Sequence, residues 1–497
     1  MDLSLLRLKQ IAVAYLCLPL FVFFLGWLQP FLSLPLCAAA AFFLYREIFR
    51  AEDDGQRLTL SKRTFFLLLA GVLFWGFCAG HAGFFYQSDD YHMRNAVFRD
   101  LIFFSWPVRY QADAMMVYYI GHWMVPAFAA KILLLLSGNE AAAWIAGNIF
   151  LWLWSGAGVF LTLLFLIAFA KASTGKAAAV CFAVFVFFSG MDVVGAVLWR
   201  GGLAWHLEWW SNIYQYSSMT TCLFWVFNQT VAPWLICAVI LQRPDVGDFG
   251  FLGTLCLFFA PFPFIGLLPF LFVYAACFLL RGKGSFYERI KPFFTGRNVL
   301  FMGGVLPVCA FYFSMTGAIN AATGTVYWRV SEWPMFFSTL SLCLLAFFLF
   351  LEYGFTALIL APFYKRDPFF ITAVVWLTFI PFFKIGPSGD FMMRASIPAL
   401  FVLMALTAKV LVLTADTLSN DLKIMKAGLV ICLCIGAFTP AVEFTRAFVF
   451  TAKAGVQNAV ADDVKSLAPF IGRPEVVNFS RIDAFETFFG RYLARKN

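Results

Sequence analysis

Charged residues are scarce in this chain: they make up 13% of its 497 residues, and histidine occurs only 4 times. Soluble globular domains are about a quarter charged, so an ordinary soluble protein is excluded. Hydrophobic residues make up 62% instead, which is typical of a chain that crosses a membrane many times. The net charge of +9 does not indicate nucleic acid as a partner, because basic residues in a membrane protein mark its cytoplasmic loops.

Several motifs are also missing. The 12 cysteines are scattered singly, nearly all in apolar runs, and none has the spacing of a zinc site. The sequence has no G-x-x-x-x-G-K-[ST] loop, no G-x-G-x-x-G between a strand and a helix, and no H-E-x-x-H. No repeat of about 20 to 50 residues is evident. ATP-driven transport, zinc-dependent hydrolysis and a disulfide framework therefore lose their usual sequence support.

Long apolar runs predict an all-α polytopic membrane protein with about thirteen transmembrane helices. A spanning helix needs about 17–25 mainly apolar residues. The run 250–280 is too long for one span, and Pro261 and Pro263 divide it into two short helices. The predicted spans are 10–28, 31–49, 64–80, 144–170, 177–197, 220–241, 250–263, 264–280, 298–316, 336–362, 368–384, 395–413 and 426–446.

The distribution of basic residues predicts a cytoplasmic N-terminus. The segments 1–9, 46–63, 171–176, 242–249, 281–297, 364–367 and 414–426 carry 19 Lys and Arg, against 8 in the longer external loops 81–143, 198–219, 317–335 and 384–394. A full span within 110–136 would place the basic segment 171–176 outside. We therefore expect juxtamembrane helices there, within a long first external loop, 81–143. Residues 1–446 form the predicted transmembrane domain, and 447–497 form a small external amphipathic tail. The short loops favour a bacterial inner membrane.

Polar residues gather on the predicted external side. The first loop supplies Asp89, Asp90, His92, Arg94 and Asn95, and the later loops supply His206, Glu208, Trp209, Arg329, Lys384, Asp390 and Arg394. Charges at a membrane edge are costly to desolvate, so this gathering predicts a functional site. The alternative is that long side chains reach toward lipid headgroups, which explains arginines better than adjacent aspartates.

Asp89 and Asp90 need not share a target, because consecutive helical residues project about 100° apart. One aspartate could face a cleft, while Asp89 could cap a helix that begins with HMRNAVFRDL. A purely structural Asp–Arg network at the interface is the alternative.

One short motif resembles a known family. A carboxylate just beyond a span, followed by an aromatic residue and an arginine (Asp90-Tyr91-His92-Met93-Arg94) and by a long loop of juxtamembrane helices, resembles the GT-C superfamily. These integral membrane glycosyltransferases use polyprenyl-phosphate-linked sugars. The chain departs from the family in the segment YYIGHWMVPAF and in the motif His206-Leu207-Glu208.

The resemblance implies an inverting sugar transfer, from a polyprenyl-phosphate-linked donor to a lipid-linked, glycan or protein acceptor, on the periplasmic side. A carboxylate would take the proton of the acceptor hydroxyl, and Asp90, with Asp89, is the candidate. Basic side chains would bind the donor phosphate, and the candidates are Arg394, Arg329 and Lys384. Acceptor or sugar contacts are expected from His92, Arg94, Asn95, His206, Glu208, Trp209 and Asp390. A divalent cation, Mg²⁺ or Mn²⁺, if one is bound, would lie among Asp89, Asp90, His206 and Glu208.

Other functions remain open. A transporter or flippase for a lipid-linked glycan would place charges within its spans and would show related halves; Glu352 and His122 are candidates, but neither lines up with a partner along the sequence. A glycan polymerase or ligase would use external arginines and a histidine instead of an aspartate base. A non-catalytic scaffold is the last alternative.

Overall fold

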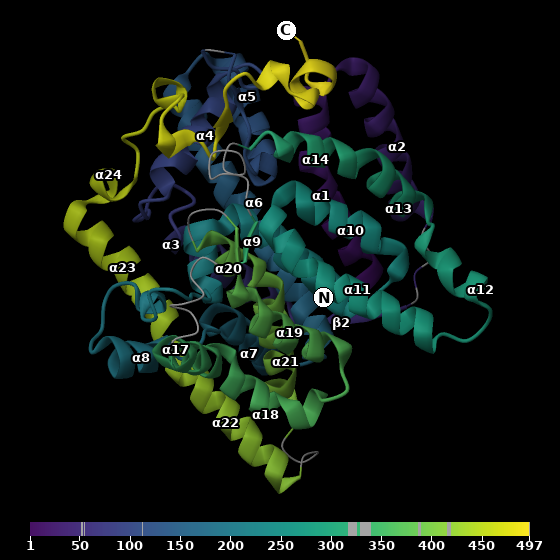
Figure 1. Ribbon diagram of the computed structural model, residues 1–497, viewed down its shortest axis with the longest axis vertical. Coiled ribbons are helices and arrows are strands. Elements are labelled where there is room, and N and C mark those ends of the chain that lie inside the picture. The colour runs from purple at the N-terminus through teal and green to yellow at the C-terminus, as the bar shows by residue number, and fades with distance from the viewer. Residues whose placement is uncertain are drawn as a thin grey trace.

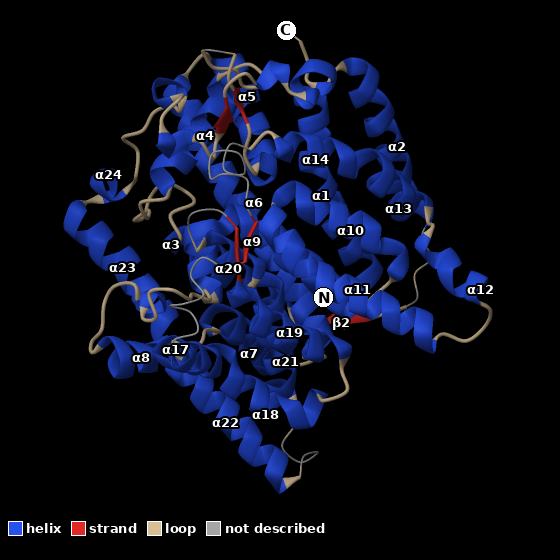
Figure 2. Cartoon of the chain, viewed as in Figure 1, coloured by secondary structure: helices blue, strands red, loops and turns tan. Residues whose placement is uncertain are grey.

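The computed structural model describes residues 1–496 except 51, 52, 54, 112, 317–325, 329–338, 386–388 and 415–418. Helices account for nearly all of its regular structure, and the strands are two or three residues long (Figure 2). Among the described residues, 11 helices are long and apolar enough to cross a membrane. The predicted all-α polytopic class is therefore confirmed, whereas the number thirteen stays a prediction.

Each predicted span falls on a helix. Ten of them coincide with long apolar helices, some of which contain a bend or a π-helical turn: α1 (Leu5–Trp27), α2 (Pro30–Arg50), α6 (Glu140–Ala170), α7 (Gly175–Phe187) with α8 (Asp192–Gly195), α9 (Met219–Gln242), α11 (Pro261–Arg281), α13 (Gly296–Leu300) with α14 (Leu306–Ser314), α17 (Thr339–Leu349) with α18 (Phe355–Tyr364), α20 (Asp390–Ala395) with α21 (Ile397–Val412), and α22 (Asn420–Gly436) with α23 (Phe438–Ala454). The other three are the shorter helices α3 (Lys62–Cys78), α10 (Val246–Phe259) and α19 (Pro368–Phe379).

The predicted division of the run 250–280 is confirmed, although it lies a few residues earlier than expected. Helix α10 ends at Phe259, and α11 begins at Pro261. Proline lacks a backbone N–H and has a fixed φ, so it suits the first turn of a helix and not its interior.

Helix α9 lies at the centre of the bundle. In its most apolar 18-residue window 94% of the residues are buried, against 17% for α2 at the periphery. It packs against α6 and α21, which are also largely buried. These three helices form the core of the bundle.

The eleventh long apolar helix, Ile120–Ser137, falls where juxtamembrane helices are predicted. Its main part, α5 (Met124–Ser137), packs antiparallel on the first half of α6: His122 contacts Ser155, and a Cβ at Gly147 would lie 3.2 Å from the Cβ of Ala130. Further along, Gly175 lies against Thr64 at the start of α3. Because α6 ends at the end of the bundle where α3 begins, α6 itself crosses the bundle, and this geometry favours an α5 that packs on α6 without a crossing of its own.

Segments predicted to be cytoplasmic meet at one end of the bundle. Lys9 Nζ lies 2.7 Å from Asp248 Oδ2, and Arg297 pairs with both Asp248 and Glu47 at 2.7 Å. Strands β1 (Asp2–Ser4) and β2 (Arg57–Thr59) pair antiparallel beside them. The structure therefore joins 1–9, 46–63, 242–249 and 281–297, as the predicted topology requires.

Segments predicted to be external meet at the other end of the bundle. There the C-terminal tail packs against the first loop. The tail continues from α23 through α24 (Val456–Ala459) and pairs through β6 (Ser480–Arg481) with β3 (Met115–Met116) of that loop. A bridge between Leu28 and Ala494 also places the tail beside the turn between α1 and α2 (Figure 1). The tail is thus a packed part of this end and not a separate appendage.

Helix α4 (Tyr91–Phe103) of the first loop carries polar side chains that are buried under the tail. Asp100 accepts hydrogen bonds from the hydroxyl of Tyr110 at 2.7 Å and from the backbone N–H of Leu467 at 3.0 Å. Burial raises the pKa of this carboxyl, and the hydrogen bond from Tyr110 partly offsets the rise. These contacts hold α4 in a fixed position.

Replacing Asp100 with alanine should therefore destabilise the protein, because two buried donors lose their acceptor, at about 1–3 kcal/mol each. The melting temperature of the purified protein should fall clearly. Asp463→Asn is the matched control. Asp463 lies on the tail that packs over α4, and its largely exposed side chain pairs with His92 of that helix. An exposed ion pair contributes about 1 kcal/mol or less. Equal melting temperatures for both variants would contradict this role of Asp100.

Candidate active site

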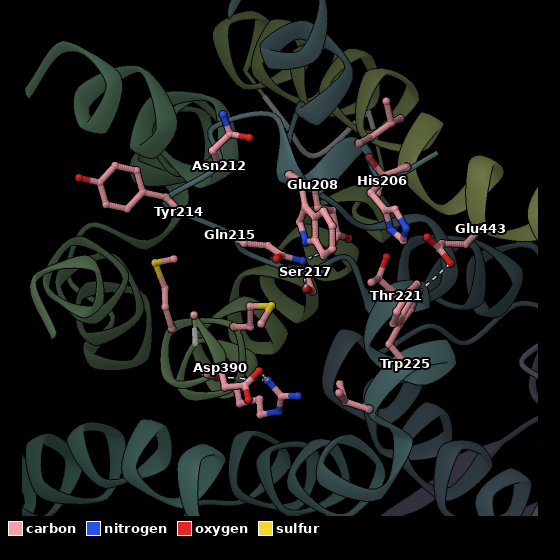
Figure 3. Close-up of a pocket in the computed structure, with 18 of the residues that line it drawn as sticks. His206, Glu208, Asn212, Tyr214, Gln215, Ser217, Thr221, Trp225, Asp390 and Glu443 are labelled. Carbon is pink, nitrogen blue, oxygen red and sulfur yellow. Dashed lines mark hydrogen bonds and ion pairs between the residues drawn. The ribbon is translucent and has the colours of Figure 1, made fainter. Parts of the chain in front are cut away.

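A cavity of about 480 Å³ lies at the end of the bundle where the predicted external segments meet. This volume falls within the range of about 300–1,000 Å³ that is typical of small-molecule sites. Its walls come from the N-terminus of α4, the segment 205–217, the start of α9, the helix α20 and the helix α23. In Figure 3, Asp390 lies across the cavity from His206 and Glu208.

Six of the predicted site residues line this cavity: Asp90, His206, Glu208, Trp209, Asp390 and Arg394. They come from three loops that are far apart in the sequence. Lys384 does not line it; this residue lies in β5 (Phe383–Ile385), opposite Tyr327 of β4 (Val326–Trp328). Arg329 lies outside the described residues.

The other predicted residues of the first loop serve a different purpose. Asn95 is buried and donates hydrogen bonds to the Gln87 side chain at 2.8 Å and to the carbonyl of Ala461 at 2.6 Å. His92 pairs with Asp463 of the tail. Neither residue lines the cavity, and both fasten the tail to α4, while their contact with a ligand stays a prediction.

The two adjacent aspartates are separated by the start of α4. Asp90, and not Asp89, occupies the capping position of this helix, and its side chain makes no capping hydrogen bond. It pairs instead with Arg94, at 2.7 Å. Asp89 is exposed and does not line the cavity. The expectation that Asp89 caps the helix is thus wrong, whereas Asp90 does face the cavity.

Three acidic residues of the cavity wall each pair with an arginine from the same helix. Asp90 pairs with Arg94, Asp390 with Arg394, and Glu443 with Arg446 at 3.0 Å. The two members of each pair are three or four positions apart, which places them on one helical face. A buried charge is costly unless it is paired. Each pair therefore lowers the free-energy cost of placing a charged side chain at the end of an apolar bundle.

Glu208 differs from these acids, because no ion pair among the described residues gives it a cation. Its carboxylate accepts hydrogen bonds from the backbone N–H of Ser218 at 2.8 Å and from Gln215 at 3.0 Å. Burial, with a smaller contribution from Asp192, raises the pKa of Glu208 to about 8. The raised pKa favours the protonated form of Glu208 at neutral pH, and a protonated carboxyl can donate a hydrogen bond to a ligand.

His206 lies between two tryptophans and an arginine. Its ring stacks on Trp209 at 4.6 Å and meets Trp225 edge-on at 5.2 Å. Arg446 lies 3.4 Å from its Nδ1, so this nitrogen accepts and Nε2 carries the hydrogen. Burial and the charge of Arg446 lower the pKa of His206, which favours the neutral ring at pH 7.

Sequence reasoning missed the contribution of α23 and the start of α9. Glu443 lines the cavity, accepts a hydrogen bond from Trp225 Nε1 at 3.0 Å and thereby joins the two helices. The sequence did contain a signal: Glu443 is the only acidic residue in the predicted span 426–446, and Arg446 follows three positions later. Thr439, one turn earlier, also lines the cavity.

The four residues expected to hold a divalent cation do not fit one. Asp90 is engaged by Arg94, His206 by Arg446, and Asp89 lies outside the cavity wall. In the part of the chain that the structure describes, no group of three or more His, Cys, Asp or Glu is arranged as a metal site. Two of these side chains are thus engaged with arginines, and a divalent cation stays a prediction.

The raised pKa of Glu208 predicts a pH-dependent contribution to stability. A carboxyl whose folded pKa of about 8 lies above its unfolded value of about 4.3 contributes stability that is complete below the lower value. That contribution is lost as the pH rises through the higher one. Wild type should therefore lose stability between these pH values relative to Glu208→Gln, as measured by melting temperatures. Parallel pH curves for the two proteins would contradict this account.

In comparisons with known proteins, no family model, no curated protein and no solved structure matches the chain.

Proposed function

We propose that this chain is a GT-C-type membrane glycosyltransferase, which transfers a sugar from a polyprenyl-phosphate-linked donor to a lipid-linked, glycan or protein acceptor. The observation that supports it is that Asp90 and Arg394, a candidate base and a candidate phosphate-binding residue, both line one cavity, at the end where the predicted periplasmic segments meet. The proposed location is a bacterial inner membrane, with the N-terminus in the cytoplasm and the cavity and C-terminus in the periplasm.

The proposed reaction inverts the anomeric carbon. Asp90 takes the proton from the acceptor hydroxyl while that oxygen attacks the carbon. The bond between the anomeric carbon and the phosphate oxygen breaks, and the lipid phosphate leaves with the bonding electrons. The half-exposed side chain of Asp90 is held by the buried Arg94, so its carboxylate is positioned without being sealed from the cavity.

The phosphate would lie near Arg394. This guanidinium is largely buried and uses one nitrogen for Asp390, which leaves further N–H groups for a phosphate. The tryptophans at the cavity wall, Trp205 and Trp209, are half-exposed, and an exposed indole face suits a sugar ring. The protonated Glu208 and the neutral His206 can donate hydrogen bonds to sugar hydroxyls.

Asp90→Asn should abolish transfer, because removal of a general base costs about 100- to 10,000-fold in rate. The measurement is mass spectrometry of envelope glycans from a deletion strain complemented with each variant, with protein levels checked by immunoblot. We expect one sugar to be missing with Asp90→Asn.

Asp113→Asn is the matched control for that experiment. Asp113 is exposed on the same loop, does not line the cavity and has a positive φ of 51°, which asparagine tolerates. A normal glycan profile with Asp90→Asn would exclude Asp90 as the base and would favour a polymerase or ligase that uses arginines.

Arg394→Gln should weaken the binding of a polyprenyl phosphate about tenfold or more, because a hydrogen bond to a charged group is worth about 1.5–3 kcal/mol. Native mass spectrometry of the purified protein with that lipid measures the effect. Arg473→Gln, an exposed change on the tail away from the cavity wall, should leave binding unaltered. Equal affinities for both variants would remove Arg394 from the proposed site.

A transporter or flippase for a lipid-linked glycan is the second candidate, and one contact favours it. Glu352, which has no partner along the sequence, lies against Asp192 inside the bundle. Buried charges within spans often mark transport pathways. A deletion strain that accumulates a complete lipid-linked glycan would favour this function over the transferase.

A further inference from the structure

A break in one membrane helix and a π-helical turn in another lie side by side. Helix α7 ends at Phe187, the chain is not helical from 188 to 191, and α8 begins at Asp192. Opposite this break, residues Phe350–Gly354 form a π-helical turn between α17 and α18. The backbone N–H of Met191 donates to the carbonyl of Leu351 at 3.1 Å and so joins the two. Irregular backbone inside a membrane domain is costly and commonly marks a binding site.

This junction holds two carboxyl groups. Asp192 begins α8, Glu352 is the central residue of the π-helical turn, and their carboxyl groups lie within interaction distance of each other. A Cβ at Gly190 would overlap the carboxyl of Glu352, and a Cβ at Gly436 would lie 2.7 Å from the carbonyl of Ser189. The absence of a side chain at Gly190 and Gly436 therefore allows the close packing that places the two acids beside each other.

Both carboxyl groups are buried, with 0% of Asp192 and 3% of Glu352 exposed. One oxygen of Asp192 accepts from Ser189 at 2.9 Å and from Thr439 at 2.8 Å, and one oxygen of Glu352 accepts from Trp210 at 2.9 Å. The second oxygen of each acid receives no donor from the groups around it. Among the described residues, no ion pair supplies either acid with a lysine, arginine or histidine.

Two carboxylates cannot remain in contact in an apolar bundle without a positive charge or a proton between them. Glu352 lies at the midpoint of the helix Leu340–Tyr364, where an uncompensated charge is most costly. Among the described residues, Glu208 of the cavity wall is a further acidic group whose charge acts on Glu352. A shared proton satisfies both unpaired oxygens with one hydrogen bond.

The pair also has a connection to the cavity. Thr439 lines the cavity and donates its hydroxyl hydrogen to Asp192 at 2.8 Å. Glu208, whose raised pKa favours the protonated form at neutral pH, lines the same cavity. Hydroxyl and carboxyl groups in sequence can pass protons between them, so the buried pair is not isolated from a ligand in the cavity.

We propose that Asp192 and Glu352 form a proton-binding site that holds one proton between two carboxyl oxygens and exchanges it with the cavity through Thr439. The proposed occupant is a proton, because among the described residues no third His, Cys, Asp or Glu joins the pair to form a metal site. Sugar transfer releases one proton for each acceptor hydroxyl consumed, and a transporter couples its cargo to ions. The site would serve either function, so it does not rest on the choice between them.

Infrared spectroscopy of the full-length protein in lipid nanodiscs tests the proposal. A protonated carboxyl gives a carbonyl band that a carboxylate lacks. The measurements use the Glu208→Gln background, because Glu208 contributes a band of its own at neutral pH. In that background, Glu352→Gln should remove a band at pH 7, and Asp192→Asn should shift it. Glutamine keeps the shape of Glu352 and can donate to Asp192, so the fold is retained.

Asp248→Asn is the control, since Asp248 is a buried acid paired with Lys9 and Arg297 at the opposite end of the bundle; it should leave the band unchanged. Transfer to heavy water should shift the Glu352 band promptly if the site exchanges with the cavity, and Thr439→Val should slow that shift. A spectrum that Glu352→Gln does not change would overturn the proposal. A band that appears only when choline replaces sodium would assign the site to a sodium ion and would overturn it too.

Discussion

The cost of moving a charged group from water into an apolar bundle governs this structure more than any single contact. The three pairs Asp90–Arg94, Asp390–Arg394 and Glu443–Arg446 each satisfy that constraint within one helix. Because each acid has its arginine three or four residues away, the three pairs can line one cavity without an unpaired charge on these acids. Acids that lack such a partner must be neutral or share a proton, and this divides the polar residues into two chemical classes. The first class can act as bases and anion binders, and the second can donate and store protons.

The position of Asp90, one of the acids paired with arginine, depends on the C-terminal tail. Helix α4 begins at the cavity with Asp90 and is held along its length by tail residues, through Asn95 and Ala461 and through Asp100 and Leu467. A functional aspartate on a free loop would sample many positions, and pre-positioning is what makes an acid–base group effective. The polar stretch 87–101 therefore combines one residue that faces the cavity with several that fasten the loop.

Much of this was predictable from local sequence. The apolar runs indicated the helices, and Pro261 marked the junction of α10 and α11. The partition of loops between two ends followed from the lysines and arginines, because each loop carries its own bias. Of the cavity wall, six residues were identified from charges and aromatics at span ends, namely Asp90, His206, Glu208, Trp209, Asp390 and Arg394. The prediction that Asp89 caps α4 was wrong, because the choice between two adjacent aspartates depends on the residue at which the helix begins. The packing of the tail over α4 was not predicted, because the two segments are far apart in the sequence.

By itself, then, the sequence determined the helical membrane class, the two ends of the bundle and which loops carry the polar groups, because hydrophobic length and charge bias are properties of short segments. Only the tertiary structure decided which polar groups meet. It brought Glu443 of the last long helix to His206 through Arg446, and it placed Asp192 against Glu352 across a helix break. Neither contact leaves a periodic trace in the sequence, since each joins residues far apart in the chain. The partner of a buried charge is set by how the helices pack.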